Sequence, residues 1–164
     1  MNESATAARR AATLLAVCLV LPLAAVAAAL VSQHVYDMQP CPWCVLQRLV
    51  FVAIAMAALA GLLLRTPLSR RIGAGLVLLL GVAGMAAALW QHFVAASSAS
   101  CNLTLADRIV GGLGLDTLAP QVFAAYASCA DAAVKLAGVP YEFYSLALFA
   151  LLAFIGLRVL RRPA

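Results

Sequence analysis

Where a short polar link meets a long apolar run, the chain reads Gln39-Pro40-Cys41-Pro42-Trp43-Cys44-Val45-Leu46-Gln47-Arg48. Pro42 suits the first position of a helix, because its missing N–H is not needed there and its φ is already helical. We therefore predict a helix that begins near Pro42, with the sulfurs of Cys41 and Cys44 at its N-terminal end. The partial positive charge of that end favours a thiolate over a thiol. Arg48 follows Cys44 by four residues, so the two share a helix face, and the guanidinium would stabilise an anion beside Cys44.

The composition is that of a membrane protein. Hydrophobic residues make up 66% of the 164 residues and charged residues 10%, with a mean hydropathy of +1.04, whereas soluble domains contain about a quarter charged residues. The length suits a single domain over residues 1–164. The net charge of +5 comes from basic residues near helix ends, and 7% aromatic residues give little for bases to stack on. We therefore expect an all-α protein embedded in a lipid bilayer, with no nucleic-acid partner.

Four apolar runs are long enough to cross a bilayer and predict a four-transmembrane-helix bundle. The expected spans cover about residues 11–31, 45–64, 72–93 and 141–157. The first run is longer than the apolar region of a signal peptide, so we interpret it as a span. Residues 65–71 are predicted to form a tight turn. The third span carries small residues that let membrane helices approach closely, namely Gly73, Gly75, Gly81 and Gly84.

Basic residues predict the orientation of the bundle. They gather near both termini and in the 65–71 turn, whereas the two opposite loops, about 32–44 and 94–140, contain only Arg108 and Lys135. The positive-inside rule then places both termini in the cytoplasm and both loops outside. The second loop is long and rather apolar. It is predicted either to lay a short amphipathic helix in the membrane interface or to pack on the rim of the bundle.

Four cysteines lie on the outer side in this topology: Cys41, Cys44, Cys101 and Cys129. An even number in an oxidising compartment suggests two disulfides, for which the sequence alone permits three pairings. A CxxC at a helix start is usually paired with itself, which would leave Cys101 with Cys129. A shared zinc site is disfavoured because Cys101 and Cys129 are not spaced as a second CxxC, so we expect no metal. Purely structural disulfides remain the alternative. Cys18, within the first span, is predicted to be a small buried hydrophobe.

Two outward-facing dithiol pairs can pass two electrons by thiol–disulfide exchange. A soluble partner would reduce the loop pair, the loop pair would reduce the CxxC, and the CxxC would discharge to a quinone, the apolar two-electron acceptor of membranes. Arg48 is predicted to face the bundle beside this quinone, with snorkelling to the interface as the alternative. His92, at the outer end of the third span, is predicted either to contact the same cofactor or to bond to the backbone at the interface.

The chain resembles the DsbB family. The resemblance lies in the four spans, Gln33-His34 before the first outer loop, Cys41-x-x-Cys44 with Arg48, Pro67-Leu68 in the turn, and Pro120-Gln121-Val122-Phe123 ahead of Cys129. It implies a thiol oxidase of the bacterial inner membrane, with periplasmic cysteine loops. Such an enzyme reoxidises a DsbA-like periplasmic thioredoxin-fold protein and passes the electrons to the membrane quinone pool, as ubiquinone or menaquinone.

The resemblance also implies roles for individual residues. Cys101 would form the mixed disulfide with the DsbA-like partner, and Cys129 would be its pair. Cys41 and Cys44 would be the quinone-coupled pair, with Cys44 next to the ring. Arg48 matches the arginine of the quinone site. His92 matches a quinone-site histidine by its position at the end of the third span.

Two other classes share some of these features. A vitamin K epoxide reductase-like oxidoreductase also places a CxxC and a loop cysteine pair on a four-helix bundle around a quinone. In that family the CxxC opens the last helix, whereas here it opens the second. A non-enzymatic four-span scaffold would hold structural disulfides, which predicts inert cysteines and no need for Arg48.

Overall fold

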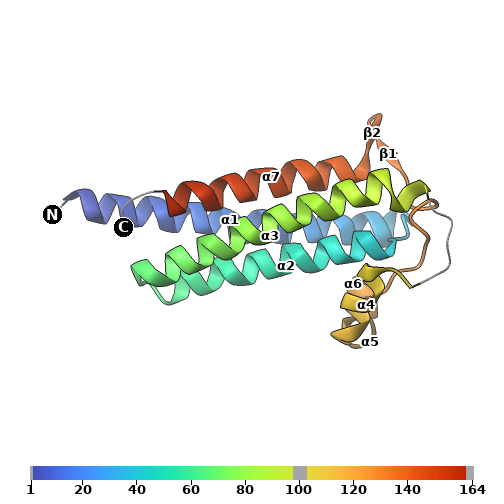
Figure 1. Cartoon of the computed structure of the whole chain (residues 1–164), viewed down its shortest axis with the longest axis horizontal. Helices are drawn as coiled ribbons and strands as arrows, with labels where there is room; N and C mark the ends of the chain where they lie inside the picture. The colour runs from blue at the N-terminus through green and yellow to red at the C-terminus, as the bar shows by residue number, and fades with distance from the viewer. Residues whose placement is uncertain (1, 98–102, 162–164) are drawn as a thin grey trace.

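The computed structural model describes residues 2–97 and 103–161, so Cys101 lies outside the described residues. Four long helices run side by side along the longest axis (Figure 1): α1 Asn2–Val35, α2 Pro42–Leu63, α3 Pro67–Phe93 and α7 Tyr141–Leu160. Each is long and apolar enough to cross a membrane. Each predicted span falls on one of these helices, and the prediction of an all-α four-helix membrane bundle is confirmed.

The helix ends follow local capping chemistry. Helix α2 begins at Pro42 as predicted, with Cys41 as its N-cap. The predicted turn over 65–71 is wrong in its length, because α3 already begins at Pro67. Thr66 Oγ1 accepts from the Ser69 N–H at 3.0 Å, and Ser69 Oγ accepts from the Thr66 N–H at 3.2 Å. This capping box starts α3 early, so Arg70 and Arg71 are helical.

The first outer link is also shorter than expected. Helix α1 continues to Val35 instead of ending near residue 31, and α2 begins at Pro42. Ser32 Oγ donates to the Ala28 carbonyl within the last turns of α1. Gln33 is therefore a helical residue with a buried side chain instead of a residue of a polar loop.

The interior of the bundle is formed by close helix contacts. Helix α3 packs mainly against α7 and α2, while α1 packs mainly against α2. A Cβ added to Gly73 would lie 2.8 Å from the Ala57 carbonyl oxygen, and one added to Gly84 would lie 2.6 Å from Cζ of Phe149. The predicted close approach is thus confirmed at these positions and at Gly81. It is wrong for Gly75, which has open space beside it.

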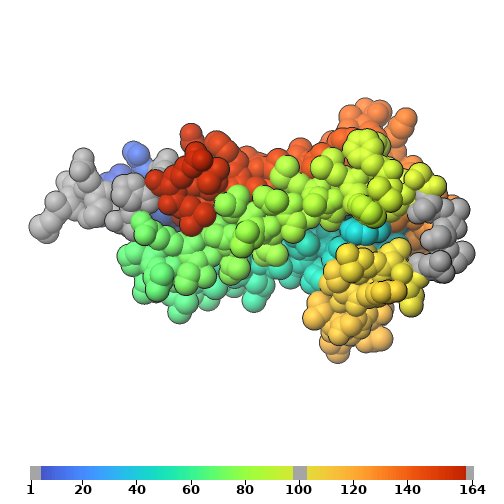
Figure 2. Space-filling view, in the orientation of Figure 1, coloured from blue at the N-terminus to red at the C-terminus, as the bar shows by residue number. Residues whose placement is uncertain are grey.

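The second loop folds at the end of the bundle opposite the start of α1 and the end of α7 (Figure 1). Its elements are η1 Ala95–Ser97, α4 Leu105–Gly112, α5 Leu115–Leu118, α6 Pro120–Phe123, and the antiparallel strands β1 Lys135–Leu136 and β2 Val139–Pro140. Figure 2 shows α4 to α6, in yellow to orange, as a lobe beside the bundle. Helix α4 packs on α2 and buries Ala106 and Val110. Packing on the rim of the bundle, one of the two expected arrangements, is therefore present.

Candidate active site

The two cysteines of the CxxC lie at the N-terminal end of α2. Cys41 is fully buried and caps the helix, since its sulfur accepts a hydrogen bond from the Cys44 N–H at 3.3 Å. The sulfurs of Cys41 and Cys44 lie 2.8 Å apart as free thiols. The helix start therefore holds both sulfurs in place for exchange with each other or with a third sulfur.

That third sulfur belongs to Cys129. Backbone N–H groups of Tyr126 and Ala127 donate to the Pro40 carbonyl at 3.0 and 3.3 Å, which docks the second loop onto the first. This docking brings the buried Cys129 side chain next to Cys41, within one buried cluster that also contains Trp43 and Ala106. Cys129, Cys41 and Cys44 thus form a continuous series of sulfurs from the second loop to α2.

Among the described residues, Cys41 and Cys129 are the thiols outside the spans, and their pKa values are shifted in opposite directions. The pKa of Cys41 is raised, because its thiol is hydrogen-bonded to Cys129 and to Cys44 and is buried. The pKa of Cys129 is lowered, chiefly because the hydrogen bond from Cys41 stabilises its thiolate. The backbone N–H of Trp43 adds to this effect and burial opposes it. Cys129 is therefore the more nucleophilic sulfur of the pair.

Arg48 is buried in the bundle instead of reaching the interface, with 6% of its surface exposed. Its Nη1 donates to Gln33 Oε1 at 2.6 Å and to the Val122 carbonyl at 3.1 Å, and its Nη2 donates to the Ala29 carbonyl at 3.4 Å. The guanidinium therefore joins α1, α2 and α6. This network fixes its position beside Cys44 more firmly than the shared helix face alone would.

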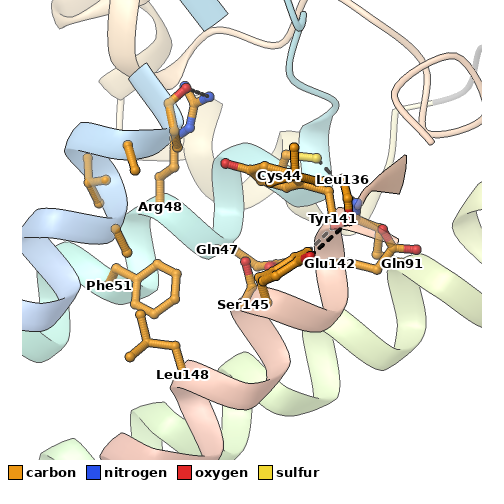
Figure 3. A pocket seen from close by; sticks show the side chains of 15 residues that line it. Cys44, Gln47, Arg48, Phe51, Gln91, Leu136, Tyr141, Glu142, Ser145 and Leu148 are labelled. Atoms are coloured by element: carbon orange, nitrogen blue, oxygen red, sulfur yellow. Dashed lines mark hydrogen bonds between the residues drawn. The ribbon is translucent and has the colours of Figure 1, made fainter. Parts of the chain in front are cut away.

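A partly open cavity of about 260 Å³ lies beside Cys44 and Arg48 and is lined by residues of α1, α2, α3, α7 and β1 (Figure 3). Two amides shape one side, since Gln47 Nε2 donates to Gln91 Oε1 at 2.6 Å and Gln91 Nε2 donates to Cys44 Sγ at 3.3 Å. The other walls are mostly apolar, with Phe51 and Leu148 among them. In Figure 3, Arg48 lies on one side of the cavity and Gln91 and Glu142 lie on the other.

His92 does not belong to the lining of this cavity. Its Nδ1 lies 2.6 Å from Glu142 Oε1, and its ring contacts those of Phe93 and Phe143. Glu142 does line the cavity and is 7% exposed. His92 therefore bonds to a carboxylate that lines the cavity, whereas one of the two predicted alternatives was a bond to the backbone at the interface. Its role toward a quinone stays a prediction.

Comparison with known proteins agrees with this arrangement. The family model described as "Disulfide bond formation protein DsbB" matches residues 9–159. The chain belongs to the DsbB family. It is 33% identical over 128 residues to "Disulfide bond formation protein B" of Herminiimonas arsenicoxydans, covering 77% of this chain and 80% of that protein. It is 34% identical over 163 residues to "Disulfide bond formation protein B 1" of Pseudomonas syringae pv. syringae, covering 98% and 92%.

Membership of the DsbB family makes this chain a multi-pass membrane protein of disulfide bond formation and an oxidoreductase. It favours this class over a vitamin K epoxide reductase-like enzyme and over a scaffold. Of the residues predicted for the site, the structure brings together Cys41, Cys44, Cys129 and Arg48. Cys101 lies outside the described residues, so its pairing with Cys129 stays a prediction.

Sequence reasoning missed four polar residues of this DsbB-family site: Gln33, Gln47, Gln91 and Glu142, all of which are buried. For Gln47 and Gln91 a signal existed, since an amide within an otherwise apolar span must find an internal hydrogen-bond partner. Gln47 follows Cys44 by three residues and so shares its helix face.

Proposed function

We propose that this DsbB-family protein is a protein-dithiol:quinone oxidoreductase of the bacterial inner membrane. It would reoxidise a DsbA-like periplasmic thioredoxin-fold protein and pass two electrons to ubiquinone or menaquinone in the membrane pool. One observation carries the proposal: Cys129 contacts Cys41, Cys41 contacts Cys44, and Cys44 lines a cavity beside Arg48. This series joins a buried thiol of the second loop to a cavity that could hold a small acceptor.

The proposed exchange starts with a Cys101–Cys129 disulfide. A thiolate of the partner attacks Cys101, and Cys129 leaves as a thiolate. Cys129 then attacks Cys41 of a Cys41–Cys44 disulfide, and Cys44 leaves with the electron pair. The partner's second thiol resolves the mixed disulfide and leaves the partner oxidised. Cys101 then displaces Cys41 from Cys129, which restores the loop disulfide and leaves the CxxC reduced by two electrons. The lowered pKa of Cys129 and its contact with Cys41 support the second exchange.

The residues around the cavity fit a quinone ring. When bound, a quinone accepts two electrons and two protons. The volume of about 260 Å³ lies just below the range usual for drug-sized ligands, so the cavity suits one ring with its tail outside. Phe51 and Leu148 offer apolar walls. Arg48 has five N–H donors, and its three bonds to protein acceptors leave others for a quinone oxygen.

The orientation of the chain is part of the proposal. The start of α1, the α2–α3 turn and the end of α7 lie at one end of the bundle (Figure 1), together with Arg65, Arg70 and Arg158. Because basic residues stay on the cytoplasmic side, we place both termini in the cytoplasm. The cysteines of the first and second loops then face the periplasm, where a DsbA-like partner would meet them.

The test is quinone absorbance in liposomes after addition of a reduced DsbA-like protein, with and without the intact protein. We expect the absorbance of oxidised ubiquinone or menaquinone to fall when the protein is present and the partner to become oxidised. Cys44→Ser should abolish the signal, whereas Cys18→Ala, which alters a buried cysteine of α1 far from the CxxC in sequence, serves as the matched control. If neither quinone changes and the partner stays reduced, the scaffold interpretation replaces this one.

A further inference from the structure

Glu142 and His92 form a pair that connects the cavity to the outside of the bundle. Glu142 lies in the first turn of α7, is 7% exposed and lines the cavity. Its Oε1 lies 2.6 Å from Nδ1 of His92, whose side chain is 32% exposed at the end of α3. One member of the pair therefore reaches the buried site and the other reaches the surface.

Few groups around the cavity can deliver a proton. From α2, Cys44 gives electrons in the proposed reaction and the Arg48 guanidinium does not release its proton. The amides of Gln47 and Gln91 do not titrate. The α1 residues that line the cavity have no proton to give, since they are Ala25, Val26, Ala28 and Ala29.

The elements nearest Glu142 contribute little more. Within α7, Tyr141 and Tyr144 also line the cavity, but phenols are weak acids, and the hydroxyl of Tyr144 already donates to the Leu136 carbonyl at 2.8 Å. Lys135 of β1 is exposed. Among the described lining residues, Glu142 is therefore the carboxyl group that could give a proton to a bound quinone, and His92 is its direct connection outward.

We propose that Glu142 and His92 form a proton relay, in which the Glu142 carboxyl gives a proton to the quinone in the cavity and His92 restores it from the periplasmic surface. The proposal rests on the proposed quinone reaction and adds the source of one proton. The geometry supports it directly, because the shared hydrogen bond between Oε1 and Nδ1 spans the boundary between the cavity and the exposed rim.

The step balances with Cys44 as a thiolate and Cys41 as a thiol. The S–H bond of Cys41 breaks, a disulfide forms between Cys41 and Cys44, and two electrons pass to the quinone. Two protons are needed to complete the quinol. The Cys41 thiol releases one, and the Glu142 carboxyl supplies the other. His92 then gives its Nδ1 proton to the carboxylate and takes one from water at Nε2. Exchange of the ring protons with water returns the imidazole to its first tautomer.

The first test uses Glu142→Gln, which keeps the size of the side chain and a hydrogen-bonding oxygen but cannot carry the proton. We expect the turnover with a soluble quinone to fall about 100-fold, the scale of general acid catalysis. The variant should also lose the part of the wild-type pH profile of turnover that depends on this carboxyl. Asp37→Asn is the matched control, because Asp37 is exposed, does not line the cavity and has a positive φ that asparagine tolerates.

A second variant tests whether the two residues act in series. His92→Gln should also slow turnover. The double variant should be no slower than Glu142→Gln alone, because either single change already interrupts the relay. Multiplying effects in the double variant would mean that the residues act independently, and the relay would be wrong.

Two measurements do not depend on turnover. Quenching of tryptophan fluorescence by added quinone should give an affinity for Glu142→Gln within about twofold of wild type. An infrared difference spectrum between quinone-loaded oxidised and reduced protein should show a carboxyl signal in wild type and Asp37→Asn that Glu142→Gln lacks. Lost quinone affinity in the variant, or no carboxyl signal in wild type, would overturn the relay.

Failure of the relay and failure of the proposed function give different results. Wild-type protein that reduces no quinone contradicts the proposed function and the relay with it. Wild-type protein that reduces quinone while Glu142→Gln keeps the same turnover and pH profile contradicts the relay alone.

Discussion

Replacing Gly84 with alanine tests how tightly the bundle is packed behind the cavity. The new Cβ would lie 2.6 Å from Cζ of Phe149, and carbon atoms normally pack at about 3.5–4.0 Å, so the ring would have to move by about 1 Å. Phe149 is fully buried and stacks on Phe51, with ring centroids 4.0 Å apart and planes at 9°. Overpacking of this kind costs about 1–3 kcal/mol, and alanine regains up to about 1 kcal/mol of helix propensity. We therefore expect a net loss of about 1–2 kcal/mol in the free energy of unfolding.

The matched control is Gly75→Ala on the same helix, where an added Cβ meets nothing within 4 Å. Stability would be measured in detergent by the reaction of a thiol reagent with Cys18, which is fully buried and is the sole thiol once the other four of the five cysteines are serine. Equal unfolding free energies for the two alanine variants, within about 0.5 kcal/mol, would refute the reasoning. Because Phe51 also lines the cavity, displacement of its stacking partner should additionally weaken quinone binding.

Three further predictions concern the sulfurs and the arginine. Arg48→His should raise the apparent KM for quinone while Cys44→Ser abolishes turnover; unchanged quinone kinetics in Arg48→His would remove the arginine from the site. Gln33→Leu removes the 2.6 Å acceptor of the buried guanidinium and should destabilise the fold by about 1–3 kcal/mol in thermal or denaturant unfolding; no loss would mean that Arg48 finds other partners. In a protein that keeps Cys41 and Cys129 but lacks the other thiols, Cys129 should be alkylated at lower pH than an ordinary thiol. The reason is that a lowered pKa keeps its thiolate present as the pH falls. Cys41→Ala should move that pH midpoint up, and an unmoved midpoint would show that Cys41 is not the cause.

The bundle could be predicted because the signals that define it are local and strong. Four apolar runs separated by polar residues give the number of helices, and Pro42 marks the start of α2 correctly. The errors lie at helix ends. The capping box of Thr66 and Ser69 uses a serine where glutamate or glutamine is usual, so the early start of α3 was easily missed.

The site was only partly predictable, because its contacts join residues far apart in the chain. The series from Cys44 to Arg48 follows from helical spacing, but the contact of Cys129 with Cys41 depends on how the second loop docks onto the Pro40 carbonyl. Gln33 is 15 residues from Arg48, and no local pattern connects them. Such pairings appear once the tertiary fold is known.

The buried polar residues show how the fold separates stability from chemistry. Within residues 5–97 and 103–161, the buried polar or charged side chains are Gln33, Gln47, Arg48, Gln91 and Glu142. They lie near the end of α1, the start of α2, the end of α3 and the start of α7, which all meet at one end of an up-and-down bundle (Figure 1). The rest of the interior is apolar.

A polar layer inside a membrane bundle costs stability unless its members bond to one another. Here the bonds run from Gln33 to Arg48 and from Gln47 through Gln91 to the sulfur of Cys44. If these residues had a structural role alone, leucine at the same positions would avoid the free-energy cost of burying polar groups. The layer is instead concentrated around the Cys44 sulfur beside the cavity, which is where a buried acceptor would need donors held in place before it arrives.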